Sequence, residues 1–238
     1  MARRKGAAGV EDGRRQVVRQ MVRILDRAYG GAAWDRGRTP PDVLDCLMRT
    51  ILSQNTNDAN RDRAYRHLRE TFPSWEAVMT ADAAAVKDAI RVAGLANQKG
   101  PCMQTFLQWL KAERGDLDLS FICDFPLGEA VRLLTRHKGV GIKTAYVTLA
   151  FACNRDVCAV DTHIHRILRR VGVIDVGCGR EKAHLELATW IPKGKARFFH
   201  VNLLDFGKEV CTARKPCCDV CPISHVCAYY RTACRAGG

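Results

Sequence analysis

The sequence predicts an all-α protein built from short helices. Apolar residues recur at helical spacing in every periodic segment, and no segment shows the strict alternation of a half-buried β-strand. Proline and glycine stand where these segments begin and end. Hydrophobic residues make up 47% and charged residues 26% of the 238-residue chain, a balance typical of a globular protein with a packed core. This length accommodates one large domain or two small ones.

The first half of the chain predicts a series of short helices. Residues 17–28 form an apolar helical segment behind a mobile basic arm of about a dozen residues. Pro40-Pro41 open the next helix, because proline is tolerated in a first helical turn, and apolar residues recur on one face as far as Leu52. The polar stretch 53–58 interrupts this pattern, and a charged helix follows up to Phe72-Pro73.

Capping residues mark the helices that come next. Asp82 caps a helix that stops at Gly94, since glycine readily adopts the left-handed conformation at a helix C-terminus. Another helix begins at Pro101 and ends near Gly115. An irregular linker over residues 116–125 separates it from the following segment.

The second half of the chain predicts five further helices. Pro126 opens one, and Gly139-Val140-Gly141 separates it from the apolar helix over residues 142–153. Three more begin near Asp161, Glu181 and Lys195. The connections are brief, and neither an internal repeat nor a low-complexity tract occurs.

Composition and charge narrow the functional class. The longest nearly apolar stretch, Ala145 to Cys153, is far shorter than the roughly 20 residues that a bilayer requires. The basic N-terminus has no apolar run behind it, so we expect neither a secretion nor a membrane signal. The expected location is cytoplasmic, associated with the nucleoid if the source is bacterial or archaeal. The net charge of +13 gathers at both ends of the chain, which favours a polyanionic partner over solubility alone.

The twelve cysteines require an explanation other than disulfides, which are improbable without export. Seven are scattered, and most of these are interpreted as small apolar residues of a reduced core. The other five lie between positions 211 and 227, and four of them have the spacing C-x6-C-x2-C-x5-C: Cys211, Cys218, Cys221 and Cys227. A single C-x2-C with ligands at close intermediate distances favours an iron–sulfur cluster over zinc. If Cys217 takes the place of Cys218 in this pattern, the spacing is C-x5-C-x3-C-x5-C.

The hairpin Gly139-Val140-Gly141 indicates an anion site. A tight turn between two helices leaves the first amides of the second helix unpaired, and with the helix dipole they suit a phosphate. Lys143 follows in the first turn of that helix, where the dipole and apolar neighbours lower a lysine pKa and free the amine as a nucleophile. An ordinary turn and an ordinary surface lysine are the alternatives.

Asp161 is the expected partner of Lys143. The helix after the hairpin is about 16 Å long at roughly 1.5 Å per residue. Residues 154–160 extend by roughly 23 Å, enough to return the chain to the N-terminus of that helix. As N-cap of the helix over residues 162–171, the carboxylate is held ionised by backbone amides. Capping alone is the alternative role.

In order and interval, these motifs resemble the endonuclease III family of the helix-hairpin-helix DNA glycosylase superfamily. The run from Lys138 to Ala145, the stretch Val160-Asp161-Thr162-His163 and the cysteine pattern carry the resemblance, with eighteen residues from Lys143 to Asp161. It extends roughly from Pro41 to Cys227.

The resemblance implies two helical domains with a DNA groove between them. Residues 36–154 form a six-helix barrel that contains the helix-hairpin-helix motif. Residues 1–35, a basic arm and helix, join residues 155–238 in a discontinuous 4Fe–4S cluster domain. The cluster is ligated by Cys211, Cys218, Cys221 and Cys227, which excludes Cys217.

The resemblance also implies roles for individual residues. Lys143 attacks the sugar C1′ and forms a Schiff base, and Asp161 assists the attack and stabilises the cationic sugar. Leu95 wedges into the duplex, and Asn55 holds the position of the gap-filling glutamine. The DNA backbone is contacted by the hairpin and by the loop between the first two cluster ligands, namely Lys138, Gly139, Val140, Gly141, Arg214 and Lys215.

Four departures from the family pattern bear on substrate choice. His137-Lys138 stand where the family has Leu-Pro, which adds charge and removes an apolar anchor from the hairpin. The glutamine of the gap-filling segment is Gln54, not Asn55, so recognition of the opposite base is expected to differ. His165 replaces an aromatic or apolar residue. About nine extra residues fall in the linker around residues 116–125.

The expected function is that of a bifunctional DNA glycosylase and AP lyase of base excision repair, removing oxidised pyrimidines. The partner is double-stranded DNA with a damaged base or an abasic site, and the protein is expected to be a monomer without membrane contact. An adenine–mismatch glycosylase is disfavoured by Lys143 and by the eleven residues after Cys227, too few for a further domain. Two readings from a different class are a non-catalytic or AP-lyase-only DNA-binding module and a zinc-stapled DNA-binding protein.

Overall fold

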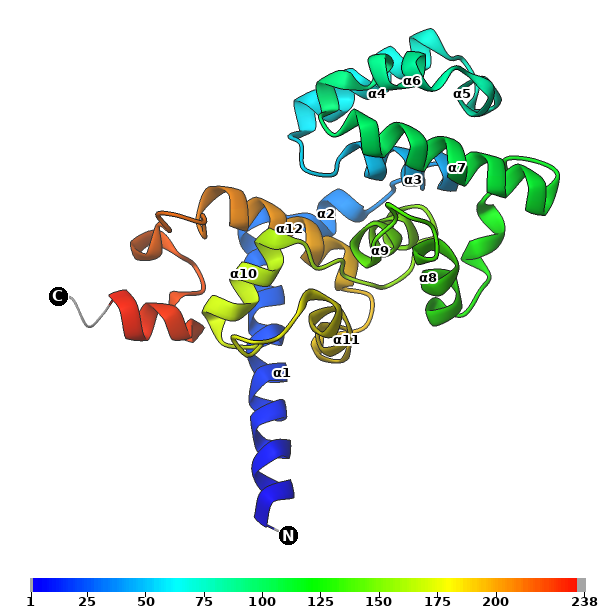
Figure 1. Ribbon diagram of the computed structural model, residues 1–238. Coiled ribbons are helices and arrows are strands. Elements are labelled where there is room, and N and C mark those ends of the chain that lie inside the picture. The colour runs from blue at the N-terminus through cyan, green and yellow to red at the C-terminus, as the bar shows by residue number, and fades with distance from the viewer. Residues whose placement is uncertain (1, 235–238) are drawn as a thin grey trace. The chain divides into compact units, whose positions relative to one another are not determined.

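The computed structural model describes residues 2–234, which divide into two compact units (Figure 1). The central unit is Pro40–Arg155, and the split unit joins the residues up to Thr39 to those from Asp156 onward. The predicted boundaries after residues 35 and 154 lie within four residues of these limits. Residues 2–234 contain helices and turns but no strand, so the all-α prediction is confirmed. Within that range no helix is long and apolar enough to cross a membrane.

Helix α3 (Val43–Leu52) lies at the centre of the central unit's core, where Leu47, Met48 and Ile51 are fully buried. Asp42 caps it by accepting a hydrogen bond from the amide of Asp45. The remaining helices of the unit are α4 (Asp58–Thr71), α5 (Trp75–Thr80), α6 (Ala83–Ala89), α7 (Ala96–Arg114), α8 (Leu127–Thr135) and α9 (Ile142–Phe151), with the short 3-10 helices η1 (Arg91–Ala93) and η2 (Ser120–Cys123). Among these, α4, α7 and α9 pack directly on α3.

Helix α7 begins five residues before the predicted start at Pro101. Leu95 adopts a left-handed conformation with φ 51°, and its carbonyl accepts the first helical hydrogen bonds from Gln98 and Lys99. Pro101 therefore stands inside the helix, where it cannot donate to the carbonyl of Asn97. Since Asn97 is exposed at the helix surface, water can satisfy that carbonyl.

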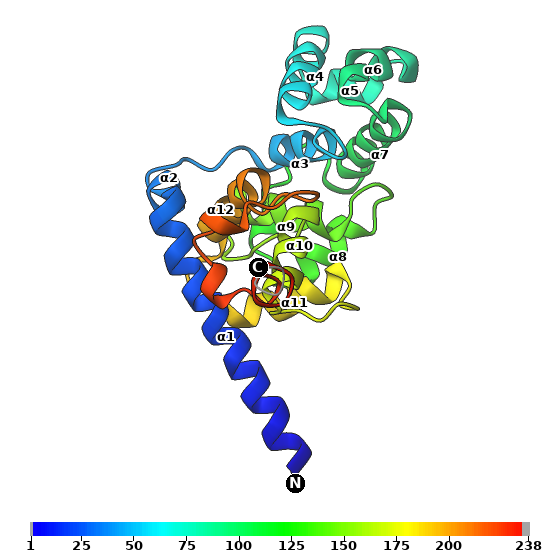
Figure 2. The same cartoon turned by 90° about the vertical axis from the view of Figure 1, so that its left-hand side faces the viewer.

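The split unit is built around its own core of buried side chains, to which α1 (Ala2–Tyr29), α12 (Ala196–Glu209) and the segments between and after them contribute. Its other elements are α2 (Gly31–Asp35), α10 (Thr162–Val171), α11 (Arg180–Trp190), η3 (Cys218–Val220), η4 (Ser224–Val226) and η5 (Tyr230–Cys234). Helix α1 packs against α11 and α12 (Figure 2). The segment predicted as a basic arm is helical from Ala2 onward, and this helix continues into the predicted one.

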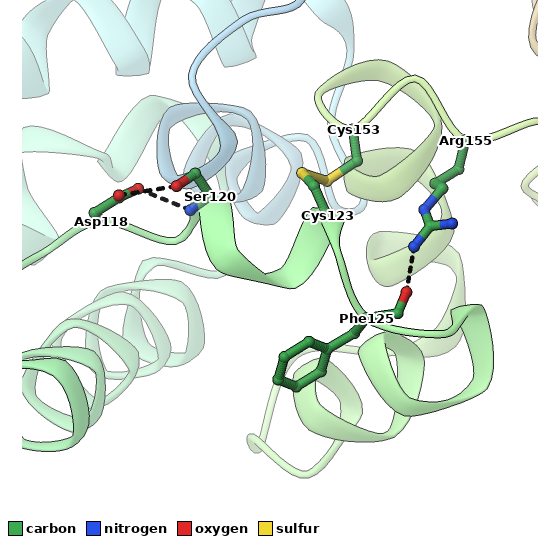
Figure 3. The surroundings of a disulfide bond; sticks show 6 residues. All are labelled: Asp118, Ser120, Cys123, Phe125, Cys153 and Arg155. Atoms are coloured by element: carbon green, nitrogen blue, oxygen red, sulfur yellow. Dashed lines mark hydrogen bonds between the residues drawn. A yellow bond between two sulfur atoms is a disulfide. The ribbon is translucent and has the colours of Figure 1, made fainter.

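A disulfide joins Cys123 at the end of η2 to Cys153 just after α9 (Figure 3). The two Cα atoms are 5.0 Å apart, and the bond closes a loop that contains α8, the hairpin and α9. Arg155 donates to the carbonyl of Phe125 nearby, so the same two chain segments are also joined by a hydrogen bond. The prediction that the scattered cysteines are free thiols is wrong for this pair, because the linker of residues 116–125 folds back onto the end of α9, a long-range contact that helical periodicity does not reveal.

Candidate functional site

The hairpin between α8 and α9 turns at Gly139, which has φ 93°. A Cβ atom at this position would lie 2.6 Å from the sulfur of Cys102 on α7, so both the backbone conformation and the available space require glycine. The amide of Val140 donates to the carbonyl of His137 at 3.0 Å and closes the turn. The Val140 side chain is buried, which anchors the hairpin to the core while Lys138 and Gly139 stay exposed.

Helix α9 begins directly after the hairpin, with Gly141 as its N-cap. The carbonyl of Gly141 accepts from the amide of Ala145 at 3.1 Å, and the amides that precede Ala145 in the first turn have no acceptor within the helix. Lys143 lies half-buried in this turn. The predicted helix start is therefore confirmed, and the amides suited to an anion belong to the same turn as the proposed nucleophile.

His137 anchors the hairpin through aromatic contacts. Its ring centroid lies 4.3 Å from that of Trp109 and 4.8 Å from that of Phe106, both on α7. The guanidinium of Arg136 lies over the ring of Trp109, 4.6 Å from its centroid. Burial, with a smaller contribution from Arg136, lowers the pKa of His137, which favours the neutral, apolar form of the ring. The expectation that this position removes an anchor is wrong, because α7 supplies aromatic partners for the imidazole.

The turn between α3 and α4 is fastened to the hairpin by Gln54. Its Nε2 donates to the carbonyl of Gly139 at 2.9 Å and to the hydroxyl of Thr144 at 3.2 Å. The next residue, Asn55, is exposed and adopts a left-handed conformation with φ 50°. Leu95, at the start of α7, is an exposed large apolar residue, with 42% of its surface accessible. Asn55 and Leu95 are therefore exposed on the surface of the central unit, whereas the side chain of Gln54 is hydrogen-bonded within that unit.

Asp161 caps α10, as the sequence predicts. Its carboxylate accepts a hydrogen bond from the amide of Ile164 at 2.8 Å. Lys143 belongs to the central unit and Asp161 to the split unit, so their proximity stays a prediction.

Two buried histidines hold the stretch of chain that leads to Asp161, a role that sequence reasoning missed. The amide of Val160 donates to Nε2 of His184 at 2.8 Å, and Nδ1 of the same ring faces the carbonyl of Arg180 at 2.7 Å. A neutral ring protonated on Nδ1 satisfies both contacts, and burial lowers the pKa of His184 accordingly. The carbonyl of Ala159 lies 2.9 Å from Nδ1 of His200. Neither histidine belongs to a recognisable motif, so only tertiary contacts reveal the role.

The clustered cysteines line one hollow in the split unit, part of which is open to solvent. Burial, reinforced by Cys227 and Cys211, raises the pKa of Cys221 to about 11, and burial also raises that of Cys227. Among residues 2–234, no three His, Cys, Asp or Glu side chains converge closely enough to hold a single metal ion. A multi-iron cluster does not require such convergence, because each cysteine sulfur binds a different iron. Cys217 lines the same hollow and is exposed.

Arginines of α10 hold the loop between the first two cysteines of this cluster. Arg170 donates to the carbonyls of Thr212 and Ala213, at 2.6 and 2.9 Å, and lies 3.3 Å from the sulfur of Cys211. Arg166 donates to the carbonyl of Cys211. The helix that carries Asp161 at its N-terminus therefore also positions this loop.

The basic pair at the tip of the same loop faces solvent. Arg214 and Lys215 are both exposed, and the hydroxyl of Thr212 donates to the carbonyl of Lys215 at 2.6 Å, which closes the turn. His165, another departure from the family pattern, points to the carbonyl of Cys178 at 2.7 Å and so takes a polar partner in the loop before α11.

Known proteins share both the sequence pattern and the fold. A profile of HhH-GPD superfamily base excision DNA repair proteins matches residues 48–193. A protein of Arabidopsis thaliana provisionally assigned as a DNA glycosylase is 37% identical over 173 residues, which cover 73% of this chain and 59% of the plant protein, so the chain spans less than two thirds of that relative. Endonuclease III of Sulfolobus acidocaldarius is 33% identical over 201 residues, 79% of this chain and 83% of the archaeal one. A solved structure of a non-covalent endonuclease III–DNA complex has a TM-score of 0.78 at 23% identity, covering 93% of this chain and 98% of its own.

Proposed function

The chain belongs to the HhH-GPD superfamily of base excision DNA repair proteins, and on this premise we propose that it is a bifunctional DNA glycosylase and AP lyase acting on oxidised pyrimidines. The observation that carries the proposal is the placement of Lys143 in the first turn of α9, directly after the hairpin. The first turn of α9 then supplies both amides that can bind a DNA phosphate and an amine that can attack a DNA sugar.

The chemistry requires an extruded nucleotide, because stacking hides C1′ from a side chain. The attack requires the neutral amine of Lys143, because an ammonium group has no electron pair to donate. Attack at C1′ forms a C–N bond while the damaged base leaves with the electrons of the glycosidic bond. The C1′–O4′ bond then breaks, O4′ takes up a proton as the amine loses one, and the adduct becomes a Schiff base. The Schiff base acidifies the 2′ proton, and loss of that proton eliminates the 3′ phosphate. Asp161 stabilises the positive charge that develops on the sugar.

The cysteine hollow is proposed to hold a 4Fe–4S cluster through Cys211, Cys218, Cys221 and Cys227. When bound, the cluster supplies a covalent staple for the C-terminal loops. The guanidinium of Arg170 donates to the sulfur of Cys211 at 3.3 Å, so a proposed ligand also has a hydrogen-bond partner on α10. The loop so fixed offers Arg214 and Lys215 to DNA phosphates.

Borohydride trapping on damaged duplex DNA tests the proposed nucleophile. Wild-type protein is expected to release an oxidised pyrimidine under single turnover and to form a covalent complex, which Lys143→Gln does not form. Lys138→Gln, which removes an exposed lysine of the same hairpin, is the matched control and is expected to retain trapping at saturating protein. Equal trapping by Lys143→Gln and wild type contradicts the assignment.

A panel of duplexes, each with one defined lesion, tests the substrate class. Release of oxidised pyrimidines supports the proposal, and release only of thymine opposite guanine replaces it with a mismatch activity. Cleavage at abasic sites without release of any base supports the AP-lyase-only alternative. Binding without any cleavage supports a non-catalytic module.

A further inference from the structure

Lys99 of α7 is an unusual buried charge. Its side chain is only 2% exposed, and its amine donates to the carbonyl of Leu52 at 2.7 Å and to the carbonyl of Ala93 at 2.8 Å. Desolvation lowers the pKa of Lys99 to about 8. Burying an amine is costly unless its donors are satisfied, so the two carbonyls explain how the fold tolerates it.

The two carbonyls stand at the ends of helical elements. Leu52 is the last residue of α3 and precedes the turn of residues 53–57, here called the filler turn. Ala93 is the last residue of η1 and precedes Gly94-Leu95, here called the wedge turn. One amine therefore joins the starts of two turns that are about 40 residues apart in the sequence, while α3 and α7 pack together (Figure 1).

Both turns contain a non-glycine residue in the left-handed region, Asn55 with φ 50° and Leu95 with φ 51°. Such conformations persist only where the surrounding structure fixes them. Lys99 also fixes the wedge turn through its main chain, because its backbone amide donates to the carbonyl of Leu95 at 3.0 Å. The residue thus binds the wedge turn through its side chain and its main chain, and the filler turn through its side chain.

We infer that Lys99 is a positioning residue for base extrusion, which fixes the filler turn and the wedge turn relative to each other before DNA binds. The inference rests on the proposed function, in which Leu95 and Asn55 occupy the space that the extruded nucleotide leaves. Two groups that enter one duplex together act best at a preset separation, because ordering them after binding reduces the net gain. Lys99 does not touch the reacting atoms, so its effect is confined to substrates that require extrusion.

Gln104 provides a matched control on the same helix. It is also buried, and its Nε2 donates to the carbonyls of Val78 and Ala81, at 3.1 and 2.9 Å. These carbonyls lie in and just after α5, not at the filler or wedge turn. Gln104→Met and Lys99→Met each remove one side-chain nitrogen that joins α7 to two carbonyls, so both variants lose comparable contacts and only one loses the connection between the turns.

The experiment compares single-turnover rates on two duplexes that carry the same oxidised pyrimidine, one fully paired and one with the lesion in an unpaired bulge. Lys99→Met is expected to lower the ratio of the paired to the unpaired rate by between about ten-fold and 10²-fold, the range for a displaced positioning group. Gln104→Met is expected to keep the wild-type ratio. An equal loss of rate on both duplexes, or the same change of ratio in Gln104→Met, overturns the inference.

A second variant covers the case in which Lys99→Met does not fold. In Lys99→Gln the side-chain nitrogen is one bond closer to the backbone, so it cannot reach both carbonyls. Its ratio of the paired to the unpaired rate is expected to lie between the wild-type ratio and the ratio expected for Lys99→Met. A ratio equal to that of wild type contradicts the inference. Failure of the wild-type protein to release any base from either duplex instead contradicts the proposed function, so the two failures are distinguishable.

Discussion

The side-chain amide of Gln54 donates to the carbonyl of Gly139 at 2.9 Å, although the two residues are 85 positions apart in the sequence. The glutamine that the sequence places beside the gap-filling position is therefore part of the support of the hairpin. This contact leaves its neighbour Asn55 as the exposed residue of the turn. It also couples the turn between α3 and α4 to the first turn of α9, whose amides are proposed to bind a DNA phosphate, because the same nitrogen reaches Thr144.

Removing this support is expected to weaken DNA binding without unfolding the protein. A neutral hydrogen bond contributes about 0.5–1.5 kcal/mol, so Gln54→Ala is expected to raise the Kd for an abasic-analogue duplex by about two- to twelve-fold. Gln108→Ala, on the exposed face of α7, is the control and is expected to leave the Kd unchanged. Fluorescence anisotropy measures both values, and an unchanged Kd for Gln54→Ala contradicts the role of this contact.

The aromatic packing of His137 predicts an acid-sensitive hairpin. The pKa of His137 is lowered in the folded protein, so the unfolded chain takes up the proton first as the pH falls below about 6.5. Stability due to this group is complete above that pH and is lost as the pH falls through the folded-state value. The loss is at most about 1.4 kcal/mol per pH unit. Denaturant unfolding of wild type and His137→Phe at pH 7 and pH 5 measures it.

In His137→Phe this proton uptake is absent. The variant is therefore expected to lose less free energy of unfolding than wild type between the two pH values. Parallel losses in both proteins mean that His137 titrates normally in the folded state, contrary to its packing between aromatic rings.

The exposed pair at the tip of the cysteine loop predicts a salt-dependent contribution to binding. Each phosphate contact adds about 0.9 to the slope of log Kd against log salt concentration. Arg214→Gln with Lys215→Gln is expected to reduce the slope by about two, and Lys182→Gln, which removes a lysine of α11 that is 67% exposed, serves as the comparison. A slope that the double variant leaves unchanged removes the loop from the DNA interface.

The cysteine hollow predicts which thiols retain iron. Cys218→Ser is expected to lower iron and acid-labile sulfide far below the wild-type content, because one ligand of the proposed cluster is lost. Cys217→Ser, at the adjacent exposed position, is expected to keep the wild-type content. The reverse result assigns the alternative spacing, and zinc in place of iron and sulfide identifies the protein as zinc-stapled.

Reduction of the Cys123–Cys153 bond is expected to destabilise the central unit. The bond closes a loop with a sequence separation of 30 residues. A disulfide of this loop length contributes about 2–4 kcal/mol by restricting the unfolded chain. Reductant is therefore expected to lower the Tm of wild type but not that of the Cys123→Ala, Cys153→Ala double variant. Equal shifts in both proteins assign the effect to another group, such as the cysteine cluster.

The local features of the fold could be predicted from the sequence because they depend on neighbouring residues. Asp161 caps α10, and Gly141 precedes α9, since capping and glycine turns are encoded within a few positions. The predicted start of α7 at Pro101 is wrong, because the helix begins earlier, directly after the left-handed Leu95. A left-handed leucine has no sequence signature.

The missed features all depend on contacts between distant segments. The sequence suggests that His137 deprives the hairpin of an apolar anchor, because it does not reveal the ring contacts with Phe106 and Trp109 of α7. Lys99 and His184 are ordinary residues of amphipathic helices until their acceptors and donors are known. The Cys123–Cys153 pair lies at the ends of two segments whose approach depends on the packing of the whole central unit.

The Cys123–Cys153 bond also has a topological consequence. Residues 123–153 form a covalently closed ring, and the ring contains both the hairpin and Lys143. A single protease cut between the two cysteines opens the ring without dividing the polypeptide, so the cleaved protein migrates as one species until it is reduced. The proposed catalytic lysine is thereby held in a segment that one backbone break cannot detach.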